Sequence, residues 1–253
     1  MPISATTSKI SRSSAYAAAT RRLALLAAAL LCGCAAPAAK PPVATGTLAQ
    51  ANLVDIRTLA PDIAEDIKYA GSDNFVGTPV DGYAAAKCYL LRPAAAALAK
   101  VERDLHAKHQ RLLLWDCYRP ARAVSHFVRW GGDLADQRTK AAHYPHLDKR
   151  VLLGDYIAPR SGHSRGATMD LTLMQCDARD EHCAPLDMGT PFDYFDPLAN
   201  TDNPDVTPAQ RAHRDLLREA MRRGGFRNYA FEWWHYTLEP EPAPDTYYDL
   251  PIR

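Results

Sequence analysis

The sequence predicts a single α+β domain behind an export segment. Helical and strand-like stretches alternate irregularly, without a repeat and without the regular strand–helix alternation that a parallel sheet needs. Beyond the N-terminus the composition does not change in character, and 47% hydrophobic with 23% charged residues is typical of a globular protein. The 30 basic and 29 acidic residues leave a net charge of +1, so a nucleic-acid partner is not expected.

The N-terminus has the features of an export signal. Arg21 and Arg22 precede the apolar run Leu23–Leu31, which is too short to span a bilayer and fits the core of a signal peptide. The next residues, "LCGC", resemble a bacterial lipobox, in which the last cysteine, here Cys34, carries the lipid. Residues 1–33 are therefore expected to be a signal peptide, with an ordinary cleaved signal or a twin-arginine signal as alternatives.

An Ala/Pro-rich stretch separates this signal from the domain. Its sequence, "AAPAAKPPVATG", offers little to bury and predicts an extended tether over residues 34–52. The folded domain is expected over residues 53–253. The protein should then be a periplasmic lipoprotein that contacts a membrane only through its N-terminal lipid.

Four cysteines remain in the domain, and an even number in an exported protein predicts two disulfides. Three pairings are open. Cys176 and Cys183 bracket the polar stretch "DARDEH" and pair most economically with each other, which leaves Cys88 for Cys117. No C-x-x-C motif is present, so a cysteine-based zinc site is not supported.

The first half of the domain predicts a short strand, a loop, a helix, a buried strand and a second helix. A strand-like start at residue 53 leads to a Gly/Pro loop over residues 74–83. Pro93 suits the first turn of a helix in 91–109. The apolar run "RLLLWDCY" predicts a buried strand, and "RPARAVSHFVRWGGD" predicts a helix that ends at two glycines.

The second half of the domain predicts a strand with polar residues on one face, then a helix, then strand structure rich in aromatic residues. In "GATMDLTL", Asp170 alternates with apolar residues, and an aspartate inside a strand needs a partner if it is buried. Thr207 is a suitable N-cap and Gly224 a suitable C-cap for a helix over residues 208–223. The aromatic stretch "FRNYAFEWWHYTLEP" predicts strand structure.

Three polar residues in these stretches form a candidate metal-binding set. His163, Asp170 and His235 offer two nitrogen donors and one oxygen donor, which zinc accepts, with a fourth position left for water. Glu232 is the candidate proton acceptor. Residues three apart in a regular strand point to opposite faces, so Glu232 and His235 share a site only if a bulge or turn interrupts "EWWH". Taken alone, His235 could instead be a packed, hydrogen-bonded histidine, and Asp170 could cap a turn.

Four motifs together resemble the zinc-dependent D-alanyl-D-alanine dipeptidases of the VanX type. They are "DIKYAGSDNFVG", "LLWDCYRPARA", "SGHSRGATMDLTL" and "FEWWHYTL", and the resemblance covers the chain from about Leu53 to its end. It implies a central antiparallel sheet with flanking helices, and one Zn²⁺ per chain on His163, Asp170 and His235. It also implies Glu232 as catalytic base.

The resemblance further implies the roles of four pocket residues and the substrate. Arg119 would stabilise the oxyanion, and Ser161, Tyr69 and Asp193 would bind a small D,D-dipeptide. Because resistance-type relatives act on D-Ala-D-Ala in the cytoplasm, an exported enzyme fits D-alanine salvage in wall turnover better. A murein D,D-carboxypeptidase and a non-catalytic zinc-binding module are the alternatives. The carboxypeptidases typically have Glu-Pro-Trp-His where this chain has "EWWH". The difference, at Trp233, favours the dipeptidase.

Overall fold

A computed structural model describes residues 42–253; the expected signal peptide, Cys34 and the first part of the tether lie outside the described residues. The helices are α1 (Arg92–His106), α2 (Ala121–Gly132), α3 (Lys140–His143), α4 (Leu152–Asp155) and α5 (Pro208–Arg223). The strands are β1 (Leu53–Asp55), β2 (Ala64–Glu65), β3 (Tyr89–Leu91), β4 (Gln110–Asp116), β5 (Thr168–Gln175), β6 (Ala184–Pro185), β7 (Phe226–Tyr229) and β8 (Glu232–Leu238). Between residues 42 and 253, no helix is long and apolar enough to span a membrane.

Two sheets organise the domain. The larger has the strand order β2-β4-β5-β8-β7, with β6 paired to β5, and only the β2–β4 pair in it is parallel. The smaller is the antiparallel β1–β3 pair. The predicted α+β class is confirmed, and the central sheet is antiparallel except at its β2 edge.

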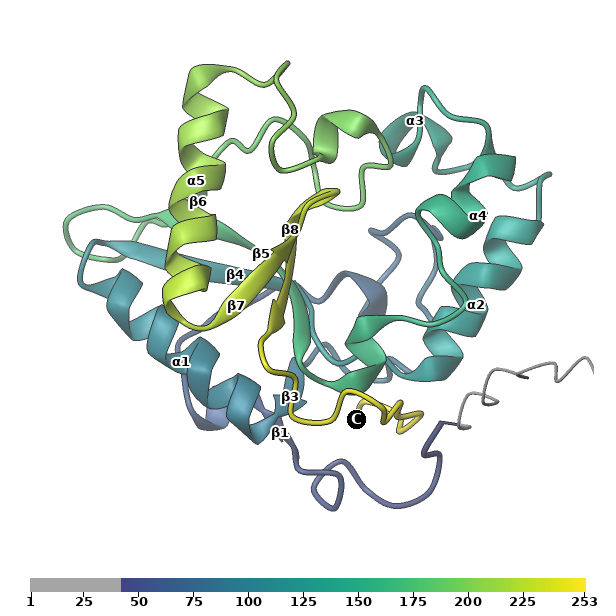
Figure 1. The fold of residues 1–253 in the computed structure, drawn as a ribbon, viewed down its shortest axis with the longest axis horizontal. Helices are drawn as coiled ribbons and strands as arrows, with labels where there is room; N and C mark the ends of the chain where they lie inside the picture. The colour runs from purple at the N-terminus through teal and green to yellow at the C-terminus, as the bar shows by residue number, and fades with distance from the viewer. Residues whose placement is uncertain (1–41) are drawn as a thin grey trace, which may run out of the picture. The chain divides into compact units, whose positions relative to one another are not determined.

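Two long helices cover one face of the larger sheet. Helix α1 packs on β4 and α5 packs on β7, and the two helices also contact each other (Figure 1). As predicted, Pro93 lies in the first turn of α1. Helix α5 begins at a capping box, in which the Thr207 hydroxyl and the Gln210 side chain each bind the other's backbone N–H. In Figure 1, α2, α3 and α4 lie on the other side of the sheet.

Strand β5 lies at the centre of the larger sheet and explains the aspartate in its sequence. Its apolar residues Met169, Leu171 and Leu173 are fully buried. The alternate residue Asp170 pairs with Asp116 of β4 on one side and with His235 of β8 on the other. Three strands therefore bring polar side chains together at one point of an otherwise apolar sheet.

Two disulfides join the predicted cysteine pairs. Cys88–Cys117 connects the residue before β3 with the residue after β4, so it links the smaller sheet to the larger one. Cys176–Cys183 closes the loop between β5 and β6.

The last residues of the expected tether already contact the domain. The Val43 N–H donates to the carbonyl of Tyr247, and the Asp249 N–H donates to the carbonyl of Val43. Ordered contacts between the two ends of the described chain thus begin before Leu53.

Candidate active site

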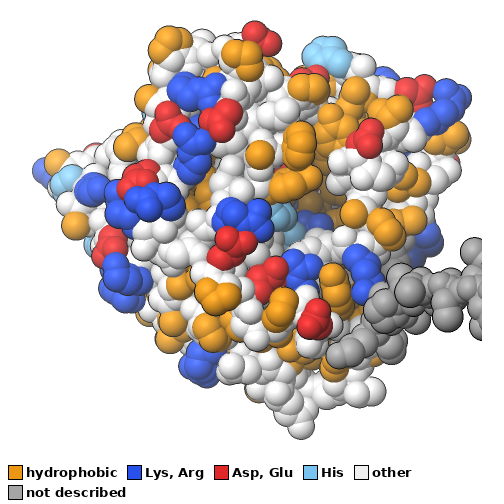
Figure 2. Space-filling view, in the orientation of Figure 1, with side chains coloured by type: hydrophobic (Ala, Val, Ile, Leu, Met, Phe, Trp, Pro, Cys, Tyr) orange, Lys and Arg blue, Asp and Glu red, His pale blue; other side chains and the backbone are white. Residues whose placement is uncertain are grey.

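A cavity of about 240 Å³ opens on the side of the larger sheet away from α1 and α5. Figure 2 shows the hollow near the middle of this face, with a histidine inside it and apolar side chains gathered along its edge. All eight catalytic, metal-binding and substrate-binding residues that the sequence predicts line this cavity. They are Tyr69, Arg119, Ser161, His163, Asp170, Asp193, Glu232 and His235.

The donor atoms of His163, Asp170 and His235 form a compact triangle. His163 Nε2 lies 3.3 Å from Asp170 Oδ2 and 3.3 Å from His235 Nδ1, and His235 Nδ1 lies 3.1 Å from Asp170 Oδ1. A tetrahedral zinc site with bonds of about 2.0–2.1 Å has donor–donor edges of roughly 3.3–3.4 Å. The spacing of 3.3 Å between the two imidazole nitrogens and the donor types therefore fit zinc, with one of the two Asp170 oxygens as the third donor.

Two further observations support a cation at this point. Asp170 Oδ1 is buried, and within the described part of the chain it accepts no well-aligned hydrogen bond, its nearest polar neighbour being the other candidate donor, His235 Nδ1, at 3.1 Å, although a buried carboxylate oxygen normally accepts one. The Nδ1–H of His163 donates to the Cys117 carbonyl at 2.8 Å, which leaves the Nε2 lone pair directed at the triangle.

The backbone around His163 depends on small residues. The short helical turn Gly162–Arg165 starts with the Ser161 hydroxyl accepting a hydrogen bond from the His163 N–H. It ends at Gly166, whose φ of 76° is left-handed. A Cβ at Gly166 would lie 2.7 Å from Leu53 Cδ2, so only glycine lets this turn pack against β1.

A bulge in β8 brings Glu232 and His235 to the same site, as the spacing required. Tyr229 pairs with Glu232 while the preceding Asn228 pairs with Tyr236, so β8 carries three extra residues at this point. The Asn228 side chain donates to the carbonyls of Glu232 and His235 at 3.0 and 3.1 Å. Asn228 thereby holds the bulge in place.

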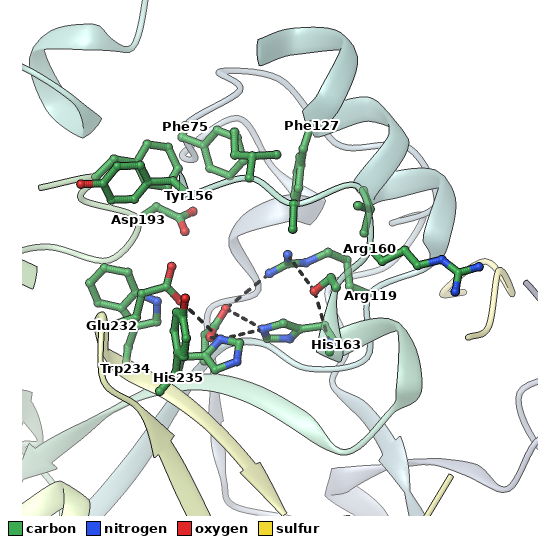
Figure 3. Close-up of a pocket in the computed structure, with 18 of the residues that line it drawn as sticks. Phe75, Arg119, Phe127, Tyr156, Arg160, His163, Asp193, Glu232, Trp234 and His235 are labelled. Carbon is green, nitrogen blue, oxygen red and sulfur yellow. Dashed lines mark hydrogen bonds and ion pairs between the residues drawn. The ribbon is translucent and has the colours of Figure 1, made fainter. Parts of the chain in front are cut away.

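Glu232 has the environment of a proton acceptor that works near neutral pH. Its Oε2 lies 3.4 Å from His235 Nδ1, and in Figure 3 its carboxylate points into the pocket beside the His235 ring. Burial raises the pKa of Glu232 to about 7, with His235 opposing the shift and Asp170 adding to it. A base is most effective when its pKa lies near the working pH.

In Figure 3, Arg119 lies across the pocket from Glu232. An aspartate outside the pocket lining, Asp116, holds the Arg119 guanidinium. Its Nε donates to Asp116 Oδ2 at 2.8 Å, and the Tyr83 hydroxyl donates to the other Asp116 oxygen at 2.6 Å. Asp116 is fully buried. The remaining guanidinium nitrogens lie 3.5 Å from Asp170 Oδ2 and from Ser161 Oγ, so the cation faces the metal-binding triangle.

Asp193 is a buried carboxylate that also lines the cavity. The Tyr69 hydroxyl lies 2.9 and 3.1 Å from its two oxygens, and within the described residues no Lys, Arg or His forms an ion pair with it. Burial, aided by Asp170, raises its pKa well above the ordinary value. Its φ of 55° is left-handed, which is uncommon for a residue with a side chain.

A buried arginine supports the loop that carries Asp193. Arg214 of α5 is 1% exposed and donates to the carbonyls of Met188, Leu198 and Asn200. Burial lowers the pKa of this guanidinium to about 10. Three carbonyls at the two ends of the loop are thus fixed by one side chain of the helix.

A second group of possible metal donors lies away from the cavity. Asp177, Glu181 and His182 are exposed on the loop closed by Cys176–Cys183. Asp177 already accepts hydrogen bonds from His182 and from two backbone N–H groups, so its oxygens are used in forming the loop.

Comparison with known proteins agrees with this geometry. Residues 49–253 match the family of peptidase M15, described as D-ala-D-ala dipeptidase. The chain belongs to this family. The chain is also similar to two proteins named D-alanyl-D-alanine dipeptidase. That of Streptomyces coelicolor is 46% identical over 77% of this chain and 95% of the relative, and that of Enterococcus faecalis is 41% identical over 74% and 91%. The Escherichia coli K12 enzyme of that name is 36% identical over 76% of this chain and 86% of its own length.

For this member of peptidase M15, the family resemblance that the motifs predicted is confirmed. Sequence reasoning did not find the residues that support the site. Asn228, Tyr83 and Arg214 carry no motif. Tyr83 and Arg214 act through contacts with segments 33 and 26 residues away. Asn228 acts on two carbonyls four and seven residues further on, which only the bulge in β8 brings within its reach. Asp116 stands at the end of the predicted buried strand "RLLLWDCY", but no local pattern indicates its contact with Tyr83, 33 residues earlier.

Proposed function

We propose that the chain is a zinc-dependent D-alanyl-D-alanine dipeptidase. The observation that carries the proposal is the triangle of His163, Asp170 and His235 with the half-buried carboxylate of Glu232 beside it. The relatives named as D-alanyl-D-alanine dipeptidases support the substrate. The reaction adds one water to the peptide bond and releases two molecules of D-alanine.

His163, Asp170 and His235 would hold the zinc. When bound there, zinc supplies a Lewis acid and lowers the pKa of a bound water toward ~7. Glu232 accepts a proton from the attacking water and returns it to the nitrogen of the leaving D-alanine. Its position next to His235 keeps the carboxylate at the point where both transfers take place.

Arg119 would stabilise the oxyanion that develops on the scissile carbonyl. Asp116 holds its guanidinium in a fixed orientation, so donors are already directed into the cavity before substrate binds. Lysine would not reproduce this arrangement, because it lacks the planar fork that Asp116 engages.

Asp193 and Tyr69 would bind the substrate ammonium, while Ser161 lies on the Arg119 side of the cavity. A buried carboxylate without a cationic partner is costly, and a substrate ammonium would remove that cost. This requirement separates a dipeptidase from a carboxypeptidase, whose substrate has no free ammonium one residue before the cut.

We further propose that the enzyme acts outside the cytoplasm, as a periplasmic lipoprotein that salvages D-alanine from wall-derived dipeptide. The support is the N-terminal sequence, with its apolar run and the "LCGC" stretch. Fractionation of cells that produce wild type or Cys34→Ser tests this: the wild type should be found with membranes and the variant should not. Equal distributions would contradict the lipid anchor.

The proposed metal site makes a direct prediction for zinc content. Wild type should bind one zinc per chain, and His163→Ala, Asp170→Ala or His235→Ala should lower the bound zinc sharply, because three protein donors cannot be replaced by two. Metal analysis after gel filtration measures this. As a control, His182→Ala in the exposed loop group should leave the zinc content unchanged. Stoichiometric zinc in the triple variant would show that the triangle is not the metal site.

A further inference from the structure

The turn after β4 positions two different parts of the site. It runs from Asp116 to Arg119. The Asp116 carboxylate orients the Arg119 guanidinium at 2.8 Å, and the Cys117 carbonyl accepts the Nδ1–H of His163 at 2.8 Å. The location of this one turn therefore determines where the guanidinium lies and which way the His163 ring faces.

The Cys117 carbonyl matters for any metal bound by His163. A carbonyl that accepts the second ring N–H of a histidine fixes its tautomer and orientation and makes the other nitrogen a better donor. Loss of such an outer partner typically lowers metal affinity about 10–100-fold. The carbonyl belongs to the backbone, so its position depends on what holds the turn.

The Cys88–Cys117 disulfide joins this turn to the residue before β3. Both cysteines are buried, with 0% and 2% exposure. Cys88 is itself anchored, because its carbonyl accepts the N–H of Ile56 at 3.0 Å. The adjoining Tyr118 N–H donates to the carbonyl of Tyr89 at 2.8 Å. The turn is thus tied to the start of β3 by one covalent bond and one hydrogen bond.

The other end of β3 holds the His163 turn. The Leu91 N–H donates to the carbonyl of Gly166 at 2.7 Å, and Gly166 ends the helical turn that carries His163. A three-residue strand therefore supports both the imidazole and the carbonyl to which it is hydrogen-bonded. Movement of the Cys117 carbonyl relative to β3 would break the alignment of that pair.

The second disulfide offers a matched comparison within the same chain. Cys176 follows the end of β5, six residues after Asp170, and a strand rises about 3.3 Å per residue, so the two lie about 20 Å apart along it. Its loop contributes no residue to the cavity. Cys176–Cys183 therefore stabilises a loop remote from the site.

We propose that the Cys88–Cys117 disulfide is a positioning element of the metal site, which holds the Cys117 carbonyl against His163 and so sets zinc affinity. The inference rests on the proposed zinc site at His163, Asp170 and His235. It assigns different roles to the two disulfides: one would be coupled to metal binding, and the other would contribute to stability alone.

Zinc titration of three proteins tests the proposal. Wild type, Cys88→Ala/Cys117→Ala and Cys176→Ala/Cys183→Ala are titrated in competition with a chromogenic chelator, at a temperature where circular dichroism shows all three folded. We expect the zinc Kd of the first pair to rise about 10–100-fold, and that of the second pair to stay within about twofold of wild type. The absorption bands of bound Co²⁺, which report ligand geometry, should shift in the first pair only.

A second variant keeps the test valid if the alanine pair does not fold. Cys88→Val/Cys117→Ala refills part of the space of the two sulfurs with the γ-methyl groups of the valine and removes the covalent bond, and it should show the same weaker binding. Equal zinc Kd values in all folded proteins would overturn the inference, and so would equal losses in both disulfide pairs. Failure of the wild type to bind zinc would instead overturn the proposed metal site itself.

Discussion

Replacing Glu232 by glutamine should lower kcat for D-Ala-D-Ala about 10²–10⁴-fold, the usual contribution of a general acid–base group. Glutamine has nearly the same shape, but its amide cannot accept a proton from water or carry one to the leaving nitrogen. The β8 bulge is held through the backbone carbonyls of residues 232 and 235 by Asn228, so it should survive the change. Stopped assays of D-alanine release measure kcat.

The same samples should show that only turnover has been lost. Zinc content should remain at one per chain, because the three donors are intact. The melting temperature should not fall, since a half-buried carboxyl group whose charge is disfavoured by desolvation has been made neutral. Glu219→Gln on the exposed side of α5 is a matched control and should have the wild-type kcat. A kcat near the wild-type value in Glu232→Gln would exclude this residue as the base.

Removing either charge of the proposed pair between the substrate ammonium and Asp193 should also lower kcat/KM strongly. N-acetyl-D-Ala-D-Ala lacks the ammonium, and we expect wild type to cleave it with kcat/KM at least ~100-fold lower than the free dipeptide, because a charged pair broken at a buried site costs several kcal/mol. Asp193→Asn should lower kcat/KM for the free dipeptide in the same way, since asparagine keeps the contact with Tyr69 without the charge.

The melting temperature shows whether Asp193→Asn affects substrate binding or folding. Asparagine tolerates the left-handed backbone of residue 193 and removes a buried carboxylate, so the melting temperature should be unchanged or higher. Asp196→Asn, in the same loop but engaged with the Leu198 N–H and His146, should have little effect on kcat/KM. Equal turnover of free and acetylated dipeptide would favour the murein D,D-carboxypeptidase over the dipeptidase.

Local patterns were sufficient to predict the main elements of the fold. Helix α5 is set by its own residues, from the Thr207 cap to the glycines that end it, and the alternation in "GATMDLTL" identifies both the strand and the face of Asp170. The spacing of Glu232 and His235 even required an irregular strand, and the bulge found in β8 meets that requirement. These features could be predicted because each depends on neighbours in the sequence.

The supporting residues could not be predicted in this way. Tyr83 reaches Asp116 across 33 residues and Arg214 reaches Met188 across 26, and no local period encodes such pairs. The short helices α3 and α4 lie in a stretch without clear periodicity, and α4 includes two residues with non-helical backbone angles. Both lie near Trp130 of α2: its ring contacts Tyr144 at the end of α3, and the buried Lys149, three residues before α4, lies over the same ring.

The hydrogen bonds from Arg214 give the loop that carries Asp193 a support of its own, on α5. The groups proposed for bond cleavage stand on β5, β8, the turn after β4 and the helical turn Gly162–Arg165. The carboxylate proposed to select the substrate stands on a loop whose ends are fastened to α5. Changes within residues 189–197 that keep both fastened ends, and that keep the contacts of Thr190 and Phe192 with the tryptophans of β8, could therefore alter which peptide is accepted while leaving the groups for hydrolysis in place. Such a division would let selection, or a designer, retune substrate choice in small steps, without first losing catalysis.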